Sequence, residues 1–138
     1  MAAVVITLDT SGLLALINTG DRDHAACRAV FERDGGPFII PVATLSEIAW
    51  TLETKLHSRV EDSFLDDLAD EVYTLDWHQR DVPRVRELSR RYRDLRLGIA
   101  DAAVIACAEP HGGRVLTTDR RHFPVVARGE RTITVLPD

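Results

Sequence analysis

Apolar and polar positions divide this chain into two kinds of segment. One kind is short and apolar throughout, and it occupies residues 4–8, 38–40, 72–75, 115–117 and 132–136. Short apolar runs rich in β-branched side chains are typical of strands buried on both faces, as in a parallel sheet. We therefore predict five strands.

Longer segments with apolar positions three or four residues apart lie between these runs, and they predict helices. They cover residues 13–17, 21–31, 44–56, 64–72, 81–95 and 99–108. The segment 99–108 is apolar on nearly every side, so we expect neighbouring elements to cover it. Strands that alternate with helices predict an α/β fold with helices on both faces of the sheet.

The length and composition favour one compact domain spanning residues 1–138, because 138 residues with 45% apolar content can fill a single core. No basic residue lies among residues 1–3, as a signal peptide would require. No apolar run reaches the roughly 20 residues that span a bilayer. We expect a soluble cytoplasmic protein without membrane contact. Cys27 and Cys107 lie in helical patterns typical of buried free thiols.

The net charge of −5 would repel nucleic acid on average, so any contact with it must come from a local feature. One such feature is the run of arginines between residues 80 and 96. This run fits either a phosphate-binding surface or a solvated helix face that also carries acidic side chains. The five histidines lie too far apart in sequence to form a zinc-ligand pattern.

Four acidic residues stand at positions where solvation alone does not explain them. Asp9 ends the first strand and Asp119 follows the fourth; Glu47 lies in the helix after the second strand, and Asp101 opens the most apolar helix. These positions all point to the carboxyl edge of a parallel sheet, where ligands bind. Clustered carboxylates need a cation, and oxygen donors suit Mg²⁺ or Mn²⁺. Such an ion would favour hydrolysis of a phosphodiester.

Each acid also has an ordinary structural interpretation. Asp9 would cap the following helix, and Glu47 would form a capping box with Thr44. Asp101 would be stabilised by the positive end of its helix, and Asp119 would be a turn residue. The apolar neighbours of Asp101 nevertheless favour an inward side chain that needs a partner.

Four segments together resemble the acidic motifs of PIN domains, and of VapC-type toxins in particular. They are Leu8-Asp9-Thr10-Ser11, Leu45-Ser46-Glu47-Ile48, Leu97-Gly98-Ile99-Ala100-Asp101-Ala102, and Leu116-Thr117-Thr118-Asp119 with Phe123. The resemblance spans essentially the whole chain. It implies a three-layer α/β/α PIN-like domain whose five-stranded parallel sheet has the order 3-2-1-4-5.

The same resemblance implies a Mg²⁺- or Mn²⁺-dependent endoribonuclease, the toxin of a toxin–antitoxin system. Its metal ligands and catalytic residues would be Asp9, Glu47, Asp101 and Asp119, with the hydroxyls of Ser11 and Thr118 supporting them. The expected partners are an RNA substrate, a cognate VapB-type antitoxin over the active site, and a second copy in a homodimer. An antitoxin arginine among the carboxylates would imitate the cation.

Residues around the fourth motif have further candidate roles. Arg120, Arg121 and His122 follow Asp119 directly and are placed to contact RNA phosphates, while Phe123 would anchor this segment in the core. Trp50 and Trp77 lie at the edges of elements, where large aromatic side chains either contact a partner or pack at the rim of the core.

Three alternative functions compete with the nuclease. A metal-dependent phosphatase of the haloacid dehalogenase type also begins with an aspartate after the first strand, but it needs a second aspartate where this chain has Ser11. A receiver domain needs a lysine after the fourth strand, and Lys55 lies too early. A catalytically inactive PIN-like binding module would keep the acids only for folding.

Overall fold

Five short parallel strands form one sheet in the structure, a computed structural model that describes residues 4–138. The strands are β1 (Ile6–Leu8), β2 (Phe38–Pro41), β3 (Tyr73–Asp76), β4 (Arg114–Leu116) and β5 (Thr134–Leu136). Their order across the sheet is β3-β2-β1-β4-β5, and every neighbouring pair is parallel. The predicted strand order is therefore confirmed.

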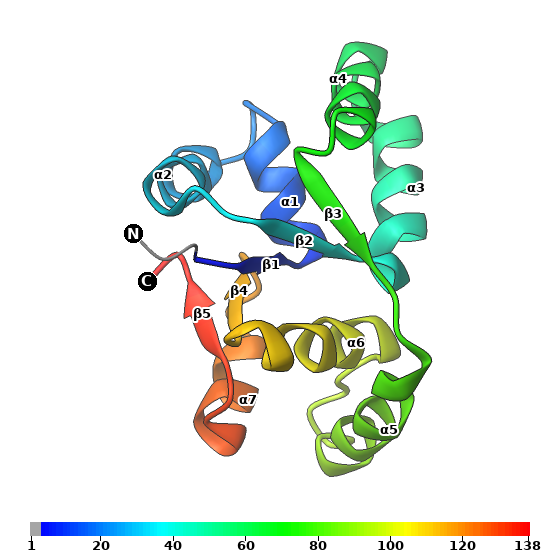
Figure 1. The fold of residues 1–138 in the computed structure, drawn as a ribbon, viewed down its shortest axis with the longest axis vertical. Coiled ribbons are helices and arrows are strands. Elements are labelled where there is room, and N and C mark those ends of the chain that lie inside the picture. The colour runs from blue at the N-terminus through cyan, green and yellow to red at the C-terminus, as the bar shows by residue number, and fades with distance from the viewer. Residues whose placement is uncertain (1–3) are drawn as a thin grey trace.

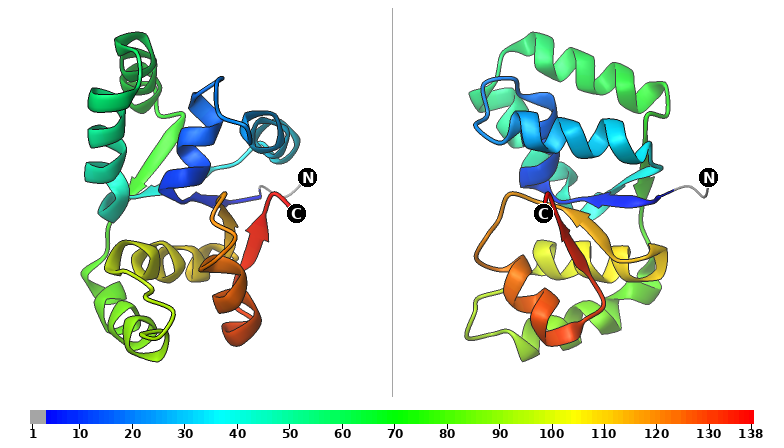
Figure 2. Two further views of the ribbon diagram at one scale, coloured as in Figure 1. Left: turned by 180° about the vertical axis from the view of Figure 1, so that it is seen from behind. Right: turned by 90° about the vertical axis from the view of Figure 1, so that its left-hand side faces the viewer.

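Helices cover both faces of this sheet, which confirms the three-layer α/β/α architecture (Figures 1 and 2). On one face lie α1 (Thr10–Ile17), α2 (His24–Asp34), α3 (Leu45–Lys55) and α4 (Ser58–Ala69). On the other lie α5 (Val82–Arg91), α6 (Ile99–Ala108) and α7 (Phe123–Glu130). Three short 3₁₀ turns complete the path: η1 (Val42–Thr44), η2 (Gln79–Asp81) and η3 (Glu109–His111).

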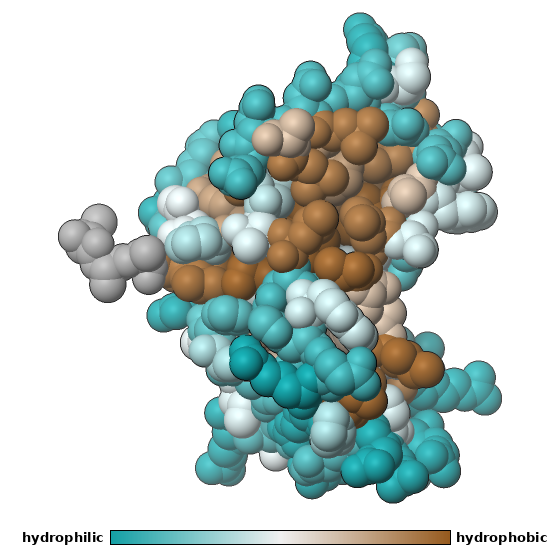
Figure 3. Space-filling model, turned by 45° about the vertical axis from the view of Figure 1, so that its right-hand side comes forward, coloured by the Kyte–Doolittle hydropathy of each residue, from teal (hydrophilic) through white to brown (hydrophobic). Residues whose placement is uncertain are grey.

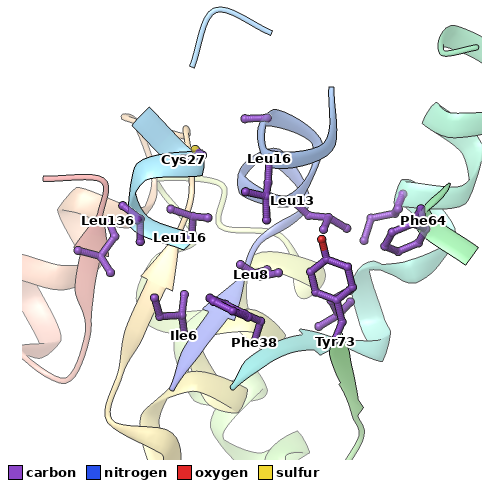
Figure 4. Close-up of a cluster of buried hydrophobic side chains, with 14 of the residues drawn as sticks. Ile6, Leu8, Leu13, Leu16, Cys27, Phe38, Phe64, Tyr73, Leu116 and Leu136 are labelled. Atoms are coloured by element: carbon purple, nitrogen blue, oxygen red, sulfur yellow. The ribbon is translucent and has the colours of Figure 1, made fainter. Parts of the chain in front are cut away.

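Each face of the sheet has its own hydrophobic core. The first core packs side chains of α1, α2, α3 and α4 against the strands, with Leu8 and Leu13 fully buried at its centre (Figure 4). The second core lies under α5, α6 and α7 and includes Phe123, which is fully buried as predicted. Cys27 and Cys107 are both free and buried, which confirms the prediction of buried free thiols.

The element boundaries differ from the sequence prediction at identifiable places. Helix α7 was not predicted, although Pro124 in its first turn is a recognised helix-start signal. Strand β3 begins at Tyr73 because Val72 still donates its N–H to the carbonyl of Asp67 at the end of α4. Pro41, expected to close the second strand, pairs with Asp76 instead. None of the helices in the described part of the chain is long and apolar enough to cross a bilayer.

A close approach between α1 and β4 fixes the first helix against the sheet. A Cβ atom added to Gly12 would fall on the backbone carbonyl of Leu116, well inside van der Waals contact. The N–H of Asp9 donates to that same carbonyl at 3.0 Å. The segment after β1 is therefore held directly against the end of β4, although more than a hundred residues separate them in sequence.

An ion-pair network joins α5, η3 and α7 on the second face. Arg84 donates to Glu109 and to Glu130 at 2.8 and 2.9 Å, and Arg91 also contacts Glu130. The hydroxyl of Tyr92 donates to Glu130 at 2.6 Å, and the Glu130 side chain is only 5% exposed. At least these two arginines of the 80–96 run therefore hold the fold together.

Candidate metal centre

The carboxyl ends of the central strands bring the first and fourth acidic motifs together. Asp9 follows β1, and Asp119 lies three residues beyond the end of β4, which pairs directly with β1. Helix α6 packs against β1 and places Asp101, in its first turn, beside them. Parallel strands end at the same edge of a sheet, so these side chains lie near one another although the sequence separates them widely. Among the described residues, the donor atoms within 4.8 Å of one another are those of Asp101, Asp119 and His122, without Asp9 or Glu47.

Asp9 is a buried carboxylate held by two hydroxyl groups. The residue is only 6% exposed. Ser11 Oγ and Thr117 Oγ1 each donate to Asp9 Oδ2 at 2.8 Å. Burial raises the pKa of Asp9, and the hydrogen bonds from Thr117 and Ser11 oppose that shift. The Asp9 side chain makes no capping hydrogen bond to α1, so helix capping does not explain its position.

Asp101 lies among the other acids. Burial is the main cause that raises the pKa of Asp101 to about 6, and the charges of Asp9, Asp119 and Glu47 raise it further. His122 is the neighbour that opposes this shift. The pKa of Asp101 is therefore raised by the charges of all the other acidic residues of the centre.

Asp119 is fixed at the start of α7. Its Oδ1 accepts the backbone N–H groups of Arg121 and His122 at 2.8 and 3.0 Å. Its Oδ2 lies 2.8 Å from Nδ1 of His122. Although burial opposes the change, these N–H groups and the imidazole lower the pKa of Asp119. Asp119 is therefore suited to remain ionised where Asp101 is less easily ionised.

Glu47 lies at the rim of the centre, in the first turn of α3, and it is exposed. The capping-box alternative fails, because Thr44 makes no side-chain cap and instead donates its hydroxyl to the carbonyl of Pro41 at 2.8 Å. Glu47 still contributes to the charge at Asp101. Its carboxylate is thus free to turn toward a ligand of the centre.

The donor set of this centre fits a hard divalent cation. One donor atom each from Asp101, Asp119 and His122 lie within 4.8 Å of one another. Among residues 4–138, no arginine or lysine forms an ion pair with Asp9, Glu47 or Asp101. Several carboxylates without a basic partner favour a cation, and carboxylate oxygens are the donors that Mg²⁺ and Mn²⁺ prefer.

Two functional candidates escaped the sequence analysis or were given another role. The hydroxyl that contacts Asp9 belongs to Thr117, whereas Thr118 uses its backbone N–H to donate to Ser11 Oγ at 3.0 Å. His122, expected beside RNA phosphates, turns its ring onto Asp119. Side chains alternate between the two sides of an extended segment, and this could have indicated that Thr117 and Thr118 point in different directions.

Arg120 and Arg121 are exposed beside Asp119. The guanidinium of Arg120 donates to the carbonyl of Pro137 at 3.3 Å, a long and exposed contact. Trp50 and Trp77 are 57% and 62% exposed. All four side chains are accessible to a partner molecule.

Comparison with known proteins finds a matching family model and a related sequence, each covering most of the chain. The model of the PIN domain family matches residues 6–129. Ribonuclease VapC26 of Mycobacterium tuberculosis is 29% identical over 133 residues, which are 94% of this chain and 98% of that protein.

Two solved structures share the fold. The crystal structure of M. tuberculosis VapC20, described as a toxin that cleaves the sarcin-ricin loop, superposes with a TM-score of 0.70 at 19% identity, covering 88% of this chain and 94% of that one. FitAcB from Neisseria gonorrhoeae superposes with a TM-score of 0.59 at 15% identity, covering 95% and 96%.

Proposed function

Because this chain belongs to the PIN domain family, we propose that it is a Mg²⁺- or Mn²⁺-dependent endoribonuclease, the toxin of a VapBC-type toxin–antitoxin pair. The observation that carries the proposal is the buried Asp9 beside Asp101 and Asp119, with no arginine or lysine paired to Asp9 or Asp101 in the described chain. The near full-length similarity to a protein named as a ribonuclease supports the same conclusion.

The metal ligands in this proposal are Asp9, Glu47, Asp101 and Asp119. A hard divalent cation held by these residues would supply the positive charge that activates a water molecule and offsets negative charge on the phosphodiester. Hydrogen bonds from Ser11 and Thr117 already orient Asp9, and the backbone N–H groups of Arg121 and His122, just before α7, orient Asp119. Such prior orientation reduces the reorganisation that the reaction requires.

The remaining residues of the site bind and align RNA. Arg120 and Arg121 have exposed guanidinium groups next to Asp119, where they neutralise substrate phosphates. Their position suits this role better than that of Arg84 and Arg91, which are occupied by Glu109 and Glu130. The proposal therefore assigns RNA contact to the segment that follows β4.

The partners follow from the toxin assignment. A cognate VapB-type antitoxin would inhibit the enzyme by covering the centre, and an antitoxin arginine would pair with the carboxylates that have no basic partner in this chain. Apolar side chains also gather on one face of the molecule (Figure 3). Large exposed apolar side chains, Trp50 and Trp77 among them, support a protein interface, either with the antitoxin or with the second copy of a homodimer.

The test is RNA cleavage by purified protein with and without a divalent cation. Wild type is expected to cleave total RNA with Mg²⁺ or Mn²⁺ and to be inactive in EDTA. Asp9→Asn and Asp101→Asn are expected to abolish cleavage while keeping the circular dichroism spectrum. Asp62→Asn, which changes an exposed carboxylate on α4, is the matched control and should keep full activity.

The outcomes separate the alternatives. Equal cleavage by wild type and Asp101→Asn would overturn the nuclease assignment. Metal binding without cleavage of any RNA would favour an inactive binding module. Release of phosphate from small phosphate esters, without RNA cleavage, would favour a metal-dependent phosphatase.

A further inference from the structure

His122 lies in the acidic centre as a nitrogen donor among carboxylates. Its donor atom and those of Asp101 and Asp119 fall within 4.8 Å of one another, a spacing that a single ion can bridge. The His122 side chain is 21% exposed and that of Asp119 is 24% exposed, so both are accessible from the centre. From this geometry, and building on the proposed function, we propose that His122 is a direct ligand of the catalytic metal ion.

The separation of the donor atoms supports direct ligation. Nδ1 of His122 and Oδ2 of Asp119 lie 2.8 Å apart. In an octahedral site with bonds of about 2.1 Å, neighbouring donor atoms lie about 3 Å apart. The two donor atoms therefore already have the spacing of adjacent ligands, and an ion bound to both, beside the line that joins them, would replace their hydrogen bond.

The backbone holds the imidazole in this place. The N–H of His122 donates to Asp119 Oδ1 at 3.0 Å, so the residue is tied to the carboxylate through its main chain as well as its ring. The next residue, Phe123, is fully buried in the second core and begins α7. This anchoring fixes the main chain of His122 beside Asp119, so the ring stays within reach of the acids.

A nitrogen ligand changes which metal the centre prefers. Mg²⁺ binds almost entirely through oxygen donors and waters, whereas imidazole suits transition metals. An all-carboxylate centre would bind both, but a centre that includes His122 favours Mn²⁺ over Mg²⁺. Replacing His122 by glutamine keeps a hydrogen-bond donor for Asp119 but removes the imidazole nitrogen.

The test is pulsed electron paramagnetic resonance of metal-free protein loaded with one equivalent of Mn²⁺. Modulation from a directly bound ¹⁴N nucleus is expected in wild type and is expected to vanish in His122→Gln. By calorimetry, the Mn²⁺ affinity of His122→Gln should fall on the order of 10-fold, with a smaller change for Mg²⁺. Labelling wild type with ¹⁵N-histidine should shift the coupling without any substitution, which covers the case of a misfolded variant.

His78→Gln is the matched control, because Nε2 of His78 contacts Asp76 Oδ1 at the same 2.8 Å but stands at the end of β3. Its ¹⁴N modulation should equal that of wild type. Bound Mn²⁺ without nitrogen coupling in wild type would overturn the ligand assignment, while metal-dependent RNA cleavage by the same sample would leave the proposed function standing. Absence of both Mn²⁺ binding and cleavage would overturn the two together.

Discussion

Replacing Asp101 with asparagine is expected to stabilise the metal-free protein at pH 7.5 while abolishing cleavage. Burial and the neighbouring acids raise the pKa of Asp101 from its ordinary 3.8 to about 6. A shift of that size corresponds to about 3 kcal/mol of unfavourable interaction for the ionised group. Asp101 is only partly buried, so solvent screening reduces the expected gain in unfolding free energy to about 1–2 kcal/mol.

The pH dependence has a definite sign. Because the folded-state pKa of Asp101 is raised, the penalty is absent below the ordinary pKa of 3.8, grows as the pH rises, and is complete above about 6. The difference in unfolding free energy between Asp101→Asn and wild type should therefore shrink as the pH is lowered from 7.5 to 4. Asp62→Asn serves again as the control and should show no such trend.

The assay is urea unfolding followed by far-ultraviolet circular dichroism, in EDTA and again with saturating Mg²⁺. With saturating Mg²⁺, wild type should become more stable than Asp101→Asn. A ligand at 100 times its dissociation constant adds about 2.7 kcal/mol to the unfolding free energy of a protein that binds it. The asparagine variant should gain much less. If Asp101→Asn is less stable than wild type in EDTA at pH 7.5, the crowding of charges at this position is refuted.

Three further predictions concern the stability of the fold and the groups around the centre. Glu130→Gln should lower the unfolding free energy by about 2 kcal/mol at pH 7, measured by urea unfolding. Although burial opposes the shift, the hydrogen bonds of Glu130 lower its pKa to about 2. The difference in unfolding free energy between the variant and wild type should therefore disappear as the pH falls from 4.5 toward 2. Gly12→Ala should cost about 2–3 kcal/mol in thermal unfolding because its Cβ meets the Leu116 carbonyl. Gly98→Ala, which has open space around it and changes only the N-cap of α6, should cost less than about 1 kcal/mol. Thr117→Val should lower the cleavage rate on the order of 10-fold, because Asp9 loses a hydroxyl donor and the Asp119 N–H loses its acceptor. Thr118→Val is the control, and an equal loss in both threonine variants would contradict this assignment.

The periodicity of the sequence determined the layers and the sheet. Uniformly apolar runs identified the five strands, and the apolar stripe from Leu45 to Leu56 identified α3. Each element could be found in this way because the spacing of its apolar residues depends on which of its sides are buried. Helix α7 was missed because only Phe123 and Val126 of its eight residues are buried, whereas α1, of the same length, buries five. A helix with so few buried positions carries little periodic signal.

The sequence by itself also named the acidic positions, since an aspartate after a buried strand, or at the start of an apolar helix, stands out locally. Only the tertiary structure decided which groups touch them. The contact between Thr117 and Asp9 spans 108 residues, and the ring of His122 could equally have faced solvent. Such contacts depend on the close packing of α1 against β4 and on the start of α7. The spacing of apolar residues along the sequence indicates which side of a helix or strand is buried. It does not indicate which distant side chain will contact that side in the folded protein.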